Sequence, residues 1–101
     1  MKVYISGAIS GTTDFMERFA KAEKGLTENG YSAVNPAKVN AQLPEDTSYE
    51  EYMKMCFCML DMCDSICMLK GWEKSCGANR ELGYALAMKK TVFYEYELIS
   101  E

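Results

Sequence analysis

Short apolar runs alternate along the chain with longer segments in which apolar residues recur at helical spacing. The short runs are residues 3–5, 31–34, 65–69 and 91–94, and the periodic segments are residues 13–28, 49–60 and 75–90. Uninterrupted apolar runs of this length are typical of strands in a parallel sheet, which is buried on both faces. The alternation predicts an α/β protein: a Rossmann-like (flavodoxin-like) parallel sheet of about four to five strands with helices on both faces.

Polar residues predict where some of these segments begin and end. Thr12 or Thr13 is placed to cap the first helix. Asn35-Pro36 ends the second strand, because the residue before a proline and the proline itself interrupt regular pairing. Residues 37–46 are then predicted to form a polar connection to the next helix.

The helix that follows has a clear start and an unusual second half. Ser48 followed by Glu51 is a capping-box pattern, which begins the helix near Tyr49. The stretch Met55–Leu60, MCFCML, is apolar on every side of a helix. Because such a helix must be covered all round, and a domain of this size cannot easily do that alone, we expect a homodimer or homotetramer formed partly through this stretch.

Composition and charge limit the possible functions. The chain of 101 residues is predicted to be a single domain, residues 1–101, and with 49% hydrophobic and 26% charged residues it is globular rather than disordered. The net charge of −4 argues against nucleic acid as a partner, because gripping the phosphate backbone requires an excess of Lys and Arg. A small anionic ligand remains possible, because backbone N–H groups at a helix start can hold one.

Nothing in the sequence indicates a membrane or an export signal. No apolar run is long enough to span a bilayer, and the apolar stretch at the start is too short for a signal peptide, so a cytoplasmic location is expected. The five cysteines are an odd number and no histidine is present to complete a mixed zinc site. Reduced thiols in the core are favoured over a metal site or a disulfide, and no metal is expected.

Candidate chemistry gathers at one predicted edge of the sheet. In a parallel α/β sheet, ligands bind at the carboxyl ends of the strands, where the strand order reverses. The segments expected to meet there are residues 6–11, residues 70–75 and the start of the last helix, which Ser75 caps. The glycine loop from Gly7 to Gly11 is by itself a weak signal, because it lacks both the GxGxxG spacing and the P-loop lysine.

Glu81 is the more informative residue of this edge. Helical spacing places it in line with Gly77, Ala78 and Ala85, which are small and apolar. A carboxylate on such a line either accepts structural hydrogen bonds, or pairs with an arginine, or acts in catalysis. Trp72 is similarly open to two interpretations, as a packing residue or as a flat apolar wall for a nucleobase.

Three segments together resemble a known superfamily. The stretches KVYISGAISG, the NP after the second strand, and CDSICMLKGWEKSCGANRELGYALA, with their spacing, are similar to the nucleoside 2-deoxyribosyltransferase-like superfamily. Within it, the chain resembles a small bacterial and phage family of unknown function that is related to deoxynucleoside-monophosphate N-glycosidases. The similarity covers nearly the whole chain, and its most specific part runs from Gly71 to Glu81.

The resemblance implies roles for individual residues. In characterised relatives, the glutamate that matches Glu81 attacks the anomeric carbon of the sugar and expels the base, as in a retaining glycosidase. No metal or organic cofactor is needed for that reaction. The residues implied to bind a deoxynucleoside or its monophosphate are Tyr4, Ser6, Gly7, Gly11, Trp72, Ser75 and Gly77. Asp64 matches an aspartate common at the start of its strand, with either a catalytic role or a role in a turn.

One position departs from the pattern of the superfamily. The relatives carry an aspartate eight residues before the position of Asp64, where it assists protonation of the departing base, and this chain has Cys56 there. A thiol in apolar surroundings stays protonated and cannot orient hydrogen bonds as a carboxylate does. Asp61 or Glu73 are possible substitutes. Three hypotheses follow: an N-glycosidase or deoxyribosyltransferase, a nucleotide-binding homo-oligomer without turnover, and a structural oligomer with a vestigial pocket.

Overall fold

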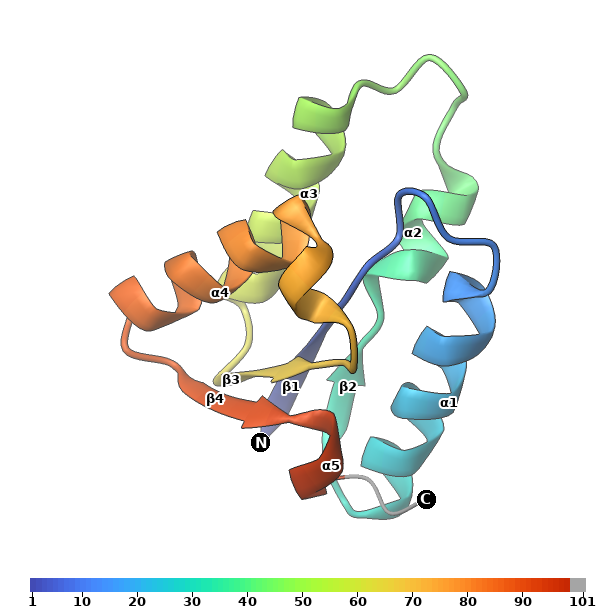
Figure 1. Cartoon of the computed structure of the whole chain (residues 1–101). Helices are drawn as coiled ribbons and strands as arrows, with labels where there is room; N and C mark the ends of the chain where they lie inside the picture. The colour runs from blue at the N-terminus through green and yellow to red at the C-terminus, as the bar shows by residue number, and fades with distance from the viewer. Residues whose placement is uncertain (99–101) are drawn as a thin grey trace.

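The computed structural model describes residues 1–98, which form a four-stranded parallel sheet with helices on both faces (Figure 1). The strands are β1 (Lys2–Ser6), β2 (Ser32–Val34), β3 (Ser65–Met68) and β4 (Thr91–Tyr94), in the order β2-β1-β3-β4. All three pairings are parallel, and in this register Tyr4 lies opposite Val34 on one side and Ile66 on the other. The predicted fold class is confirmed.

Successive residues of the central strands face the two layers of helices alternately. Val3 and Ile5 point toward helix α1 (Phe15–Glu28), where they pack with Phe19, Ala22 and Leu26. Tyr4 and Ile66 point to the other face, which is covered by α3 (Tyr49–Asp61) and α4 (Cys76–Ala87). The alternation therefore turns the side chains of Tyr4 and Ser6 toward α4, the helix that carries Glu81.

The start of α1 differs from the prediction that Thr12 or Thr13 caps it. The helix begins after Asp14, whose side chain makes no capping hydrogen bond. The Thr12 hydroxyl instead donates to the backbone oxygen of Ile9 at 2.9 Å, which tightens the loop after β1. A threonine two residues before the cap is thus used by the loop, and the cap prediction is wrong.

Two helices lie where none was expected. Residues 37–46 were predicted to be a polar connection, but Pro36–Gln42 form helix α2. Asn35 caps it by accepting a hydrogen bond from the backbone N–H of Ala37 at 3.0 Å, and Pro36 takes the first helical position, which suits its fixed φ. A short helix, α5 (Glu95–Leu98), follows β4.

The other two predicted caps are confirmed. Ser48 and Glu51 form the reciprocal capping box at the start of α3, with bonds of 2.8 and 3.1 Å. Ser75 caps α4 by accepting from the backbone N–H of Ala78, directly after a short 3₁₀ turn, η1 (Trp72–Lys74). These caps fix the amino ends of the two helices that cover the Glu81 face of the sheet.

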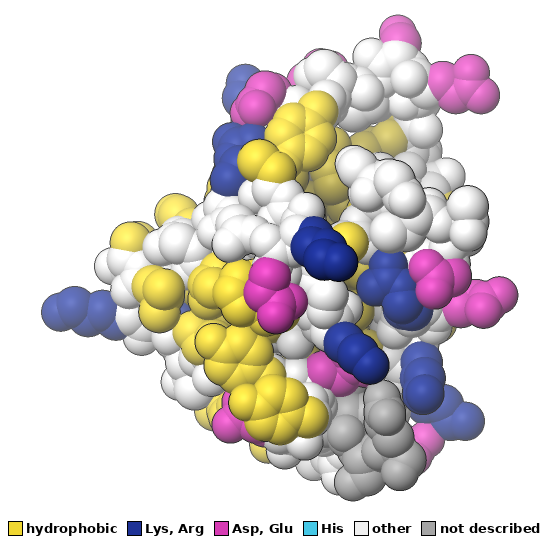
Figure 2. Space-filling view, in the orientation of Figure 1, with side chains coloured by type: hydrophobic (Ala, Val, Ile, Leu, Met, Phe, Trp, Pro, Cys, Tyr) yellow, Lys and Arg dark blue, Asp and Glu magenta, His cyan; other side chains and the backbone are white. Residues whose placement is uncertain are grey.

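Apolar side chains remain exposed on this side of the molecule. In α3, Cys56 and Leu60 are buried, whereas Met55 is 39% exposed and Cys58 is exposed as well. A second apolar patch, which includes the rings of Trp72, Tyr94 and Tyr96, covers the region of β4 and α5 (Figure 2). None of the helices formed by residues 1–98 has the length and apolar content needed to cross a lipid bilayer.

Candidate active site

A cavity of about 360 Å³ opens at the carboxyl end of the sheet. It lies where the chain leaves β1 and β3, the point at which the strand order reverses, as expected for a ligand site of this fold. The two loops approach closely there, because a Cβ added at Gly7 would meet the Leu69 side chain at 3.1 Å. The volume falls within the range of small-molecule sites, which is about 300–1,000 Å³.

Glu81 lies on the wall of this cavity and is 6% exposed. Its two carboxylate oxygens each accept a hydrogen bond from β1. The Tyr4 hydroxyl donates to Oε2 at 2.6 Å, and the Ser6 hydroxyl donates to Oε1 at 2.7 Å. Tyr4 and Ser6 are themselves buried and do not line the cavity. These two residues, expected to bind substrate, therefore hold the carboxylate from behind.

Burial raises the pKa of the Glu81 carboxyl above its usual value, because desolvation penalises the charged form. The hydrogen bonds from Tyr4, Ser6 and the thiol of Cys56 act in the opposite direction, but the net shift is upward. A carboxyl in this state is poorly solvated and is held in one orientation. Both properties suit a group that forms a bond to an electron-poor carbon at the cavity wall.

No cation is paired with Glu81 among the described residues. The neighbouring guanidinium of Arg80 instead bonds both oxygens of Glu50 in α3, at 3.0 and 3.1 Å. The Arg80 guanidinium also lies over the rings of Tyr49 and Phe57, 5.7 and 5.5 Å from their centroids. The arginine thus joins α3 to α4, and the alternative that Glu81 is one half of a structural ion pair is excluded.

Cys56 and Tyr52 lie behind Glu81 on α3. Cys56 is 1% exposed, and its thiol interacts with the side chains of Tyr4, Tyr52 and Glu81. Burial raises the pKa of this thiol to about 11, so it is protonated at neutral pH. The buried hydroxyl of Tyr52 has no hydrogen-bond partner among residues 1–98, and its polar neighbours are Cys56 and Glu81. A thiol is a weak acceptor and does not satisfy it.

The unsatisfied hydroxyl leads to a stability prediction. Replacing Tyr52 with Phe removes a buried polar group that makes no bond, so the free energy of unfolding should rise by about 0.5–1 kcal/mol, measured by urea denaturation. The matched control is Tyr4→Phe, which removes a hydroxyl that is bonded to Glu81 and should cost about 1–3 kcal/mol. Destabilisation by Tyr52→Phe would show that its hydroxyl has a partner after all.

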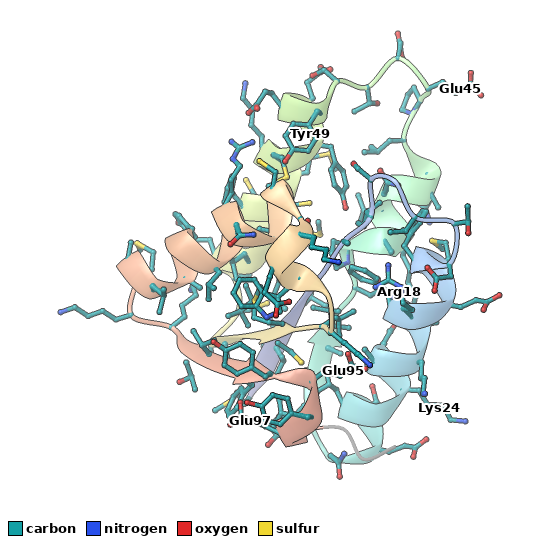
Figure 3. The ribbon with its side chains drawn as sticks, in the orientation of Figure 1. Arg18, Lys24, Glu45, Tyr49, Glu95 and Glu97 are labelled. Atoms are coloured by element: carbon teal, nitrogen blue, oxygen red, sulfur yellow. The ribbon has the colours of Figure 1, made fainter. Side chains whose placement is uncertain are left out.

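The mouth of the cavity is polar and lies at the amino end of α4. Lys74, Ser75 and Gly77 line it, together with Tyr49 from the first turn of α3. Figure 3 shows Tyr49 reaching from α3 toward this end of α4. The approach is close, because a Cβ added at Gly77 would meet the Tyr49 hydroxyl at 3.2 Å. Gly77 therefore serves the contact between two helices as well as the cavity wall.

The loop after β1 forms the opposite rim. Gly7, Ile9 and Ser10 line the cavity there. The loop is held by Arg18 of α1, whose guanidinium donates to the backbone oxygen of Ala8 at 2.7 Å, and Figure 3 shows this side chain pointing from α1 toward the middle of the molecule. This tether fixes the rim without placing the arginine in the cavity.

Three residues predicted for the site are not brought to it. Asp64 lies at the amino end of β3, opposite the cavity, and accepts a hydrogen bond from the backbone N–H of Lys2 at 2.9 Å. Trp72 packs against Tyr94, with ring centroids 6.2 Å apart, and does not line the cavity. Gly11 is exposed and turns the loop at φ +79°. The structural role proposed for Asp64 therefore agrees with its place in the fold, and the catalytic one does not.

The structure also brings residues to the site that the sequence analysis missed. From α1, α2 and α3 come Phe19, Pro36, Tyr52 and Met53, and from the turn before α4 comes Lys74. The signal for Tyr49, Tyr52 and Met53 was their i, i+3, i+4 spacing, which places them on one side of a helix. Pro36 belongs to the helix that was not predicted.

The site contains no arrangement typical of a metal centre. Among residues 1–98, no three Cys, Asp or Glu side chains are grouped so that they would hold a metal ion. All five cysteines are free in this part of the chain. The groups of the cavity wall that can take part in chemistry are the carboxyl group of Glu81, the amine of Lys74, the thiol of Cys76 and hydroxyl groups.

Comparisons with known proteins place the fold. It is similar to 2-deoxyribosyltransferase from the psychrotolerant bacterium Bacillus psychrosaccharolyticus, with a TM-score of 0.76 and 20% identity, covering 93% of this chain and 71% of that one. An NAD(P)H:quinone oxidoreductase from Methanothermobacter marburgensis has a TM-score of 0.41 and 19% identity, covering 80% of this chain and 50% of that one. No curated protein matches the sequence. The model of the DUF4406 family, a domain of unknown function, matches residues 1–94, and the chain therefore belongs to that family.

Proposed function

We propose that the protein cleaves or exchanges the N-glycosidic bond of a 2′-deoxynucleoside or its 5′-monophosphate, with Glu81 as the nucleophile. The observation that carries this proposal is a buried carboxylate with no cationic partner among residues 1–98, which two hydroxyl donors hold at the wall of a cavity of ligand size. The likeness of the fold to a 2-deoxyribosyltransferase supports it.

The proposed reaction proceeds in two displacements. A carboxylate oxygen of Glu81 forms a bond to the anomeric carbon, while the bond from that carbon to the base nitrogen breaks and the base leaves with the electron pair. Water or a second base then attacks the same carbon and releases Glu81. Positive charge develops on the sugar in both steps, and the fixed carboxylate stabilises it in a site of low polarity.

The raised pKa of Glu81 gives this reaction a pH dependence. The nucleophile is the ionised form, so the rate should fall as the pH decreases through the pKa of Glu81. Because burial raises that pKa, the acid limb of kcat/KM should lie above the pKa of an ordinary glutamate, which is about 4.3.

A second candidate function is favoured by Cys56. The protein would bind a deoxynucleotide without turnover, because the protonated thiol beside Glu81 replaces the acid that relatives are inferred to use. Lys74 and the amino end of α4 would still hold an anionic group at the mouth of the cavity.

The two candidates are separated by one experiment on the wild-type protein. It is incubated with the four 2′-deoxynucleoside 5′-monophosphates, free base is measured by chromatography, and binding is measured by thermal denaturation. Release of base supports the enzyme. A raised melting temperature without base release supports the binding protein, and neither effect would contradict both.

We also propose that the stretch Met55–Leu60 of α3 contributes to a homodimer or homotetramer through its exposed side chains, Met55 and Cys58. Sedimentation at micromolar concentration should show an oligomer, and Met55→Glu should shift it toward monomer because a charge would be buried. Lys54→Glu, an exposed charge change on the same helix, is the matched control. A wild-type monomer would contradict the proposal.

A further inference from the structure

The cavity is lined by exposed, mostly polar side chains at its mouth and by buried apolar side chains at its floor. The mouth carries the exposed side chains of Ser10, Lys74 and Cys76. The floor is formed by Ile5, Phe19, Pro36 and Met53, which are at most 2% exposed. Glu81 is the acidic residue of the wall and is nearly as deeply buried. A ligand that reaches Glu81 must therefore place one end in an apolar compartment.

Two polar groups close in sequence to the cavity lining are already engaged in hydrogen bonds. Asn35, which precedes Pro36, accepts from the backbone N–H of Ala37 and donates to Glu23. The backbone oxygen of Ile9 accepts from both the N–H and the hydroxyl of Thr12. These amide and carbonyl groups do not face the cavity unpaired, and so they are not free to read a base.

The two tyrosines of the wall do not supply such groups either. The hydroxyl of Tyr52 has almost no accessible surface and points toward Cys56 and Glu81. The hydroxyl of Tyr49 lies beside Gly77 at the amino end of α4, on the side of the mouth. Both rings are therefore available to a ligand as apolar surface.

We propose that the floor formed by Ile5, Phe19, Pro36 and Met53 holds the leaving base by apolar contact and selects it by size and shape, without reading its hydrogen-bonding edge. This rests on the proposed function, because Glu81 fixes where the anomeric carbon lies. The ligand enters base first, and its 5′ end faces Lys74 at the mouth. An anionic group at that end keeps its solvation while the base is desolvated against the floor.

An apolar floor and a floor of hydrogen-bonding groups differ in how strongly they discriminate between a base and its isostere. A site built from hydrogen-bonding groups rejects an analogue without the matching groups by large factors, because buried partners are left unpaired. An apolar site has no such partners, so an isostere without polar edges loses nothing on the protein side. It also avoids the cost of desolvating the edge of the natural base.

The test compares natural nucleotides with isosteres of the same shape. Dissociation constants for the wild-type protein are measured by calorimetry for thymidine 5′-monophosphate and for the 2,4-difluorotoluene C-deoxyriboside 5′-monophosphate. A purine pair is 2′-deoxyadenosine 5′-monophosphate and the 4-methylindole deoxyriboside 5′-monophosphate. The titrations are repeated with Glu81→Gln, so that cleavage of the natural nucleotide does not enter its dissociation constant, and chromatography measures any base released by wild type. In each pair the natural nucleotide should bind less than about tenfold more tightly than its isostere.

Two variants of Met53 test whether a polar group in the floor creates a preference for the natural nucleotide over its isostere. Met53→Gln places an amide in the floor at nearly constant side-chain length, and it should raise the preference for the natural nucleotide above tenfold. Met53→Leu, which adds no polar group, should leave the ratio of the two dissociation constants within about threefold of wild type. If Met53→Gln does not fold, as judged by its thermal melt, the wild-type ratios decide.

The outcomes distinguish this inference from the function on which it rests. If the natural nucleotides bind more than tenfold tighter than their isosteres, the inference that the base is held by apolar contact alone is wrong. The proposed function is not affected by that result. Failure of both members of both pairs to bind overturns the proposed function, and the floor with it. Binding of both members with similar affinity supports the apolar floor, and release of base from the natural nucleotide supports the proposed function.

Discussion

Glu81→Gln is expected to lower base release by at least about 10³-fold while it changes nucleotide binding only a few-fold. The substitution keeps the size of the side chain but removes the oxygen that forms the bond to the sugar, and loss of a nucleophile typically removes most of the rate enhancement. Binding is expected to persist, because glutamine keeps the size of the side chain and the rest of the cavity wall is unchanged. Single-turnover release of base and calorimetric binding measure the two effects separately.

The same substitution should stabilise the fold at neutral pH. Because the pKa of Glu81 is raised in the folded state, the folded protein binds more protons than the unfolded chain between the two pKa values. The stability that Glu81 contributes is therefore fully present below the pKa of its carboxyl in the unfolded chain, about 4.3. It is lost as the pH rises through the pKa of the same carboxyl in the folded protein. Glutamine removes this loss, so we expect the melting temperature of Glu81→Gln, relative to that of wild type, to rise as the pH is raised from about 4 to about 7.

Glu73→Gln is the matched control for both effects. Glu73 is exposed in the turn before α4 and does not line the cavity. Its replacement should leave base release and melting temperature unchanged. Base release by Glu81→Gln within tenfold of wild type would contradict the role of Glu81 as nucleophile.

The positions of the strands were predictable because each depends on a local pattern. The apolar runs at residues 3–5, 65–69 and 91–94 coincide with β1, β3 and β4 to within a residue at each end, and the parallel order follows from the alternation with helices. The caps at Ser48 and Ser75 were equally local. Helix α2 was missed because Asn35-Pro36 fits the end of a strand as well as the start of a helix. In the structure these two residues follow the end of β2 and also begin α2.

The site was predictable only in part, because it is assembled by tertiary contacts. Gly7, Ser75, Gly77 and Glu81 meet at one cavity, as expected from the carboxyl ends of β1 and β3. A linear pattern does not show which neighbour a side chain faces, however. The hydroxyl of Tyr4 points at Glu81 and not into the cavity because alternate residues of β1 face α4.

Cys56→Asp is expected to raise base release by about 10²-fold or more. A carboxyl group reaches one atom further than the thiol from the same backbone position, among the side chains of Tyr52 and Glu81 with which Cys56 already interacts. Two carboxyl groups this close cannot both ionise easily, so one retains a proton near neutral pH. Proton donation to a leaving base is worth about 10²–10⁴-fold in rate. The Tyr52 hydroxyl, which has no hydrogen-bond partner among residues 1–98, gains an acceptor at the same time.

The matched control is Cys56→Asn, which has the same shape and cannot donate a proton at neutral pH. Base release should increase only for Cys56→Asp, and the increase should disappear as the pH rises and the introduced carboxyl ionises. Thermal melts of both variants measure the cost of a buried polar group, about 1–3 kcal/mol. If Cys56→Asp folds and binds nucleotide without any gain over Cys56→Asn, protonation of the base does not limit turnover, and the binding protein becomes the better description.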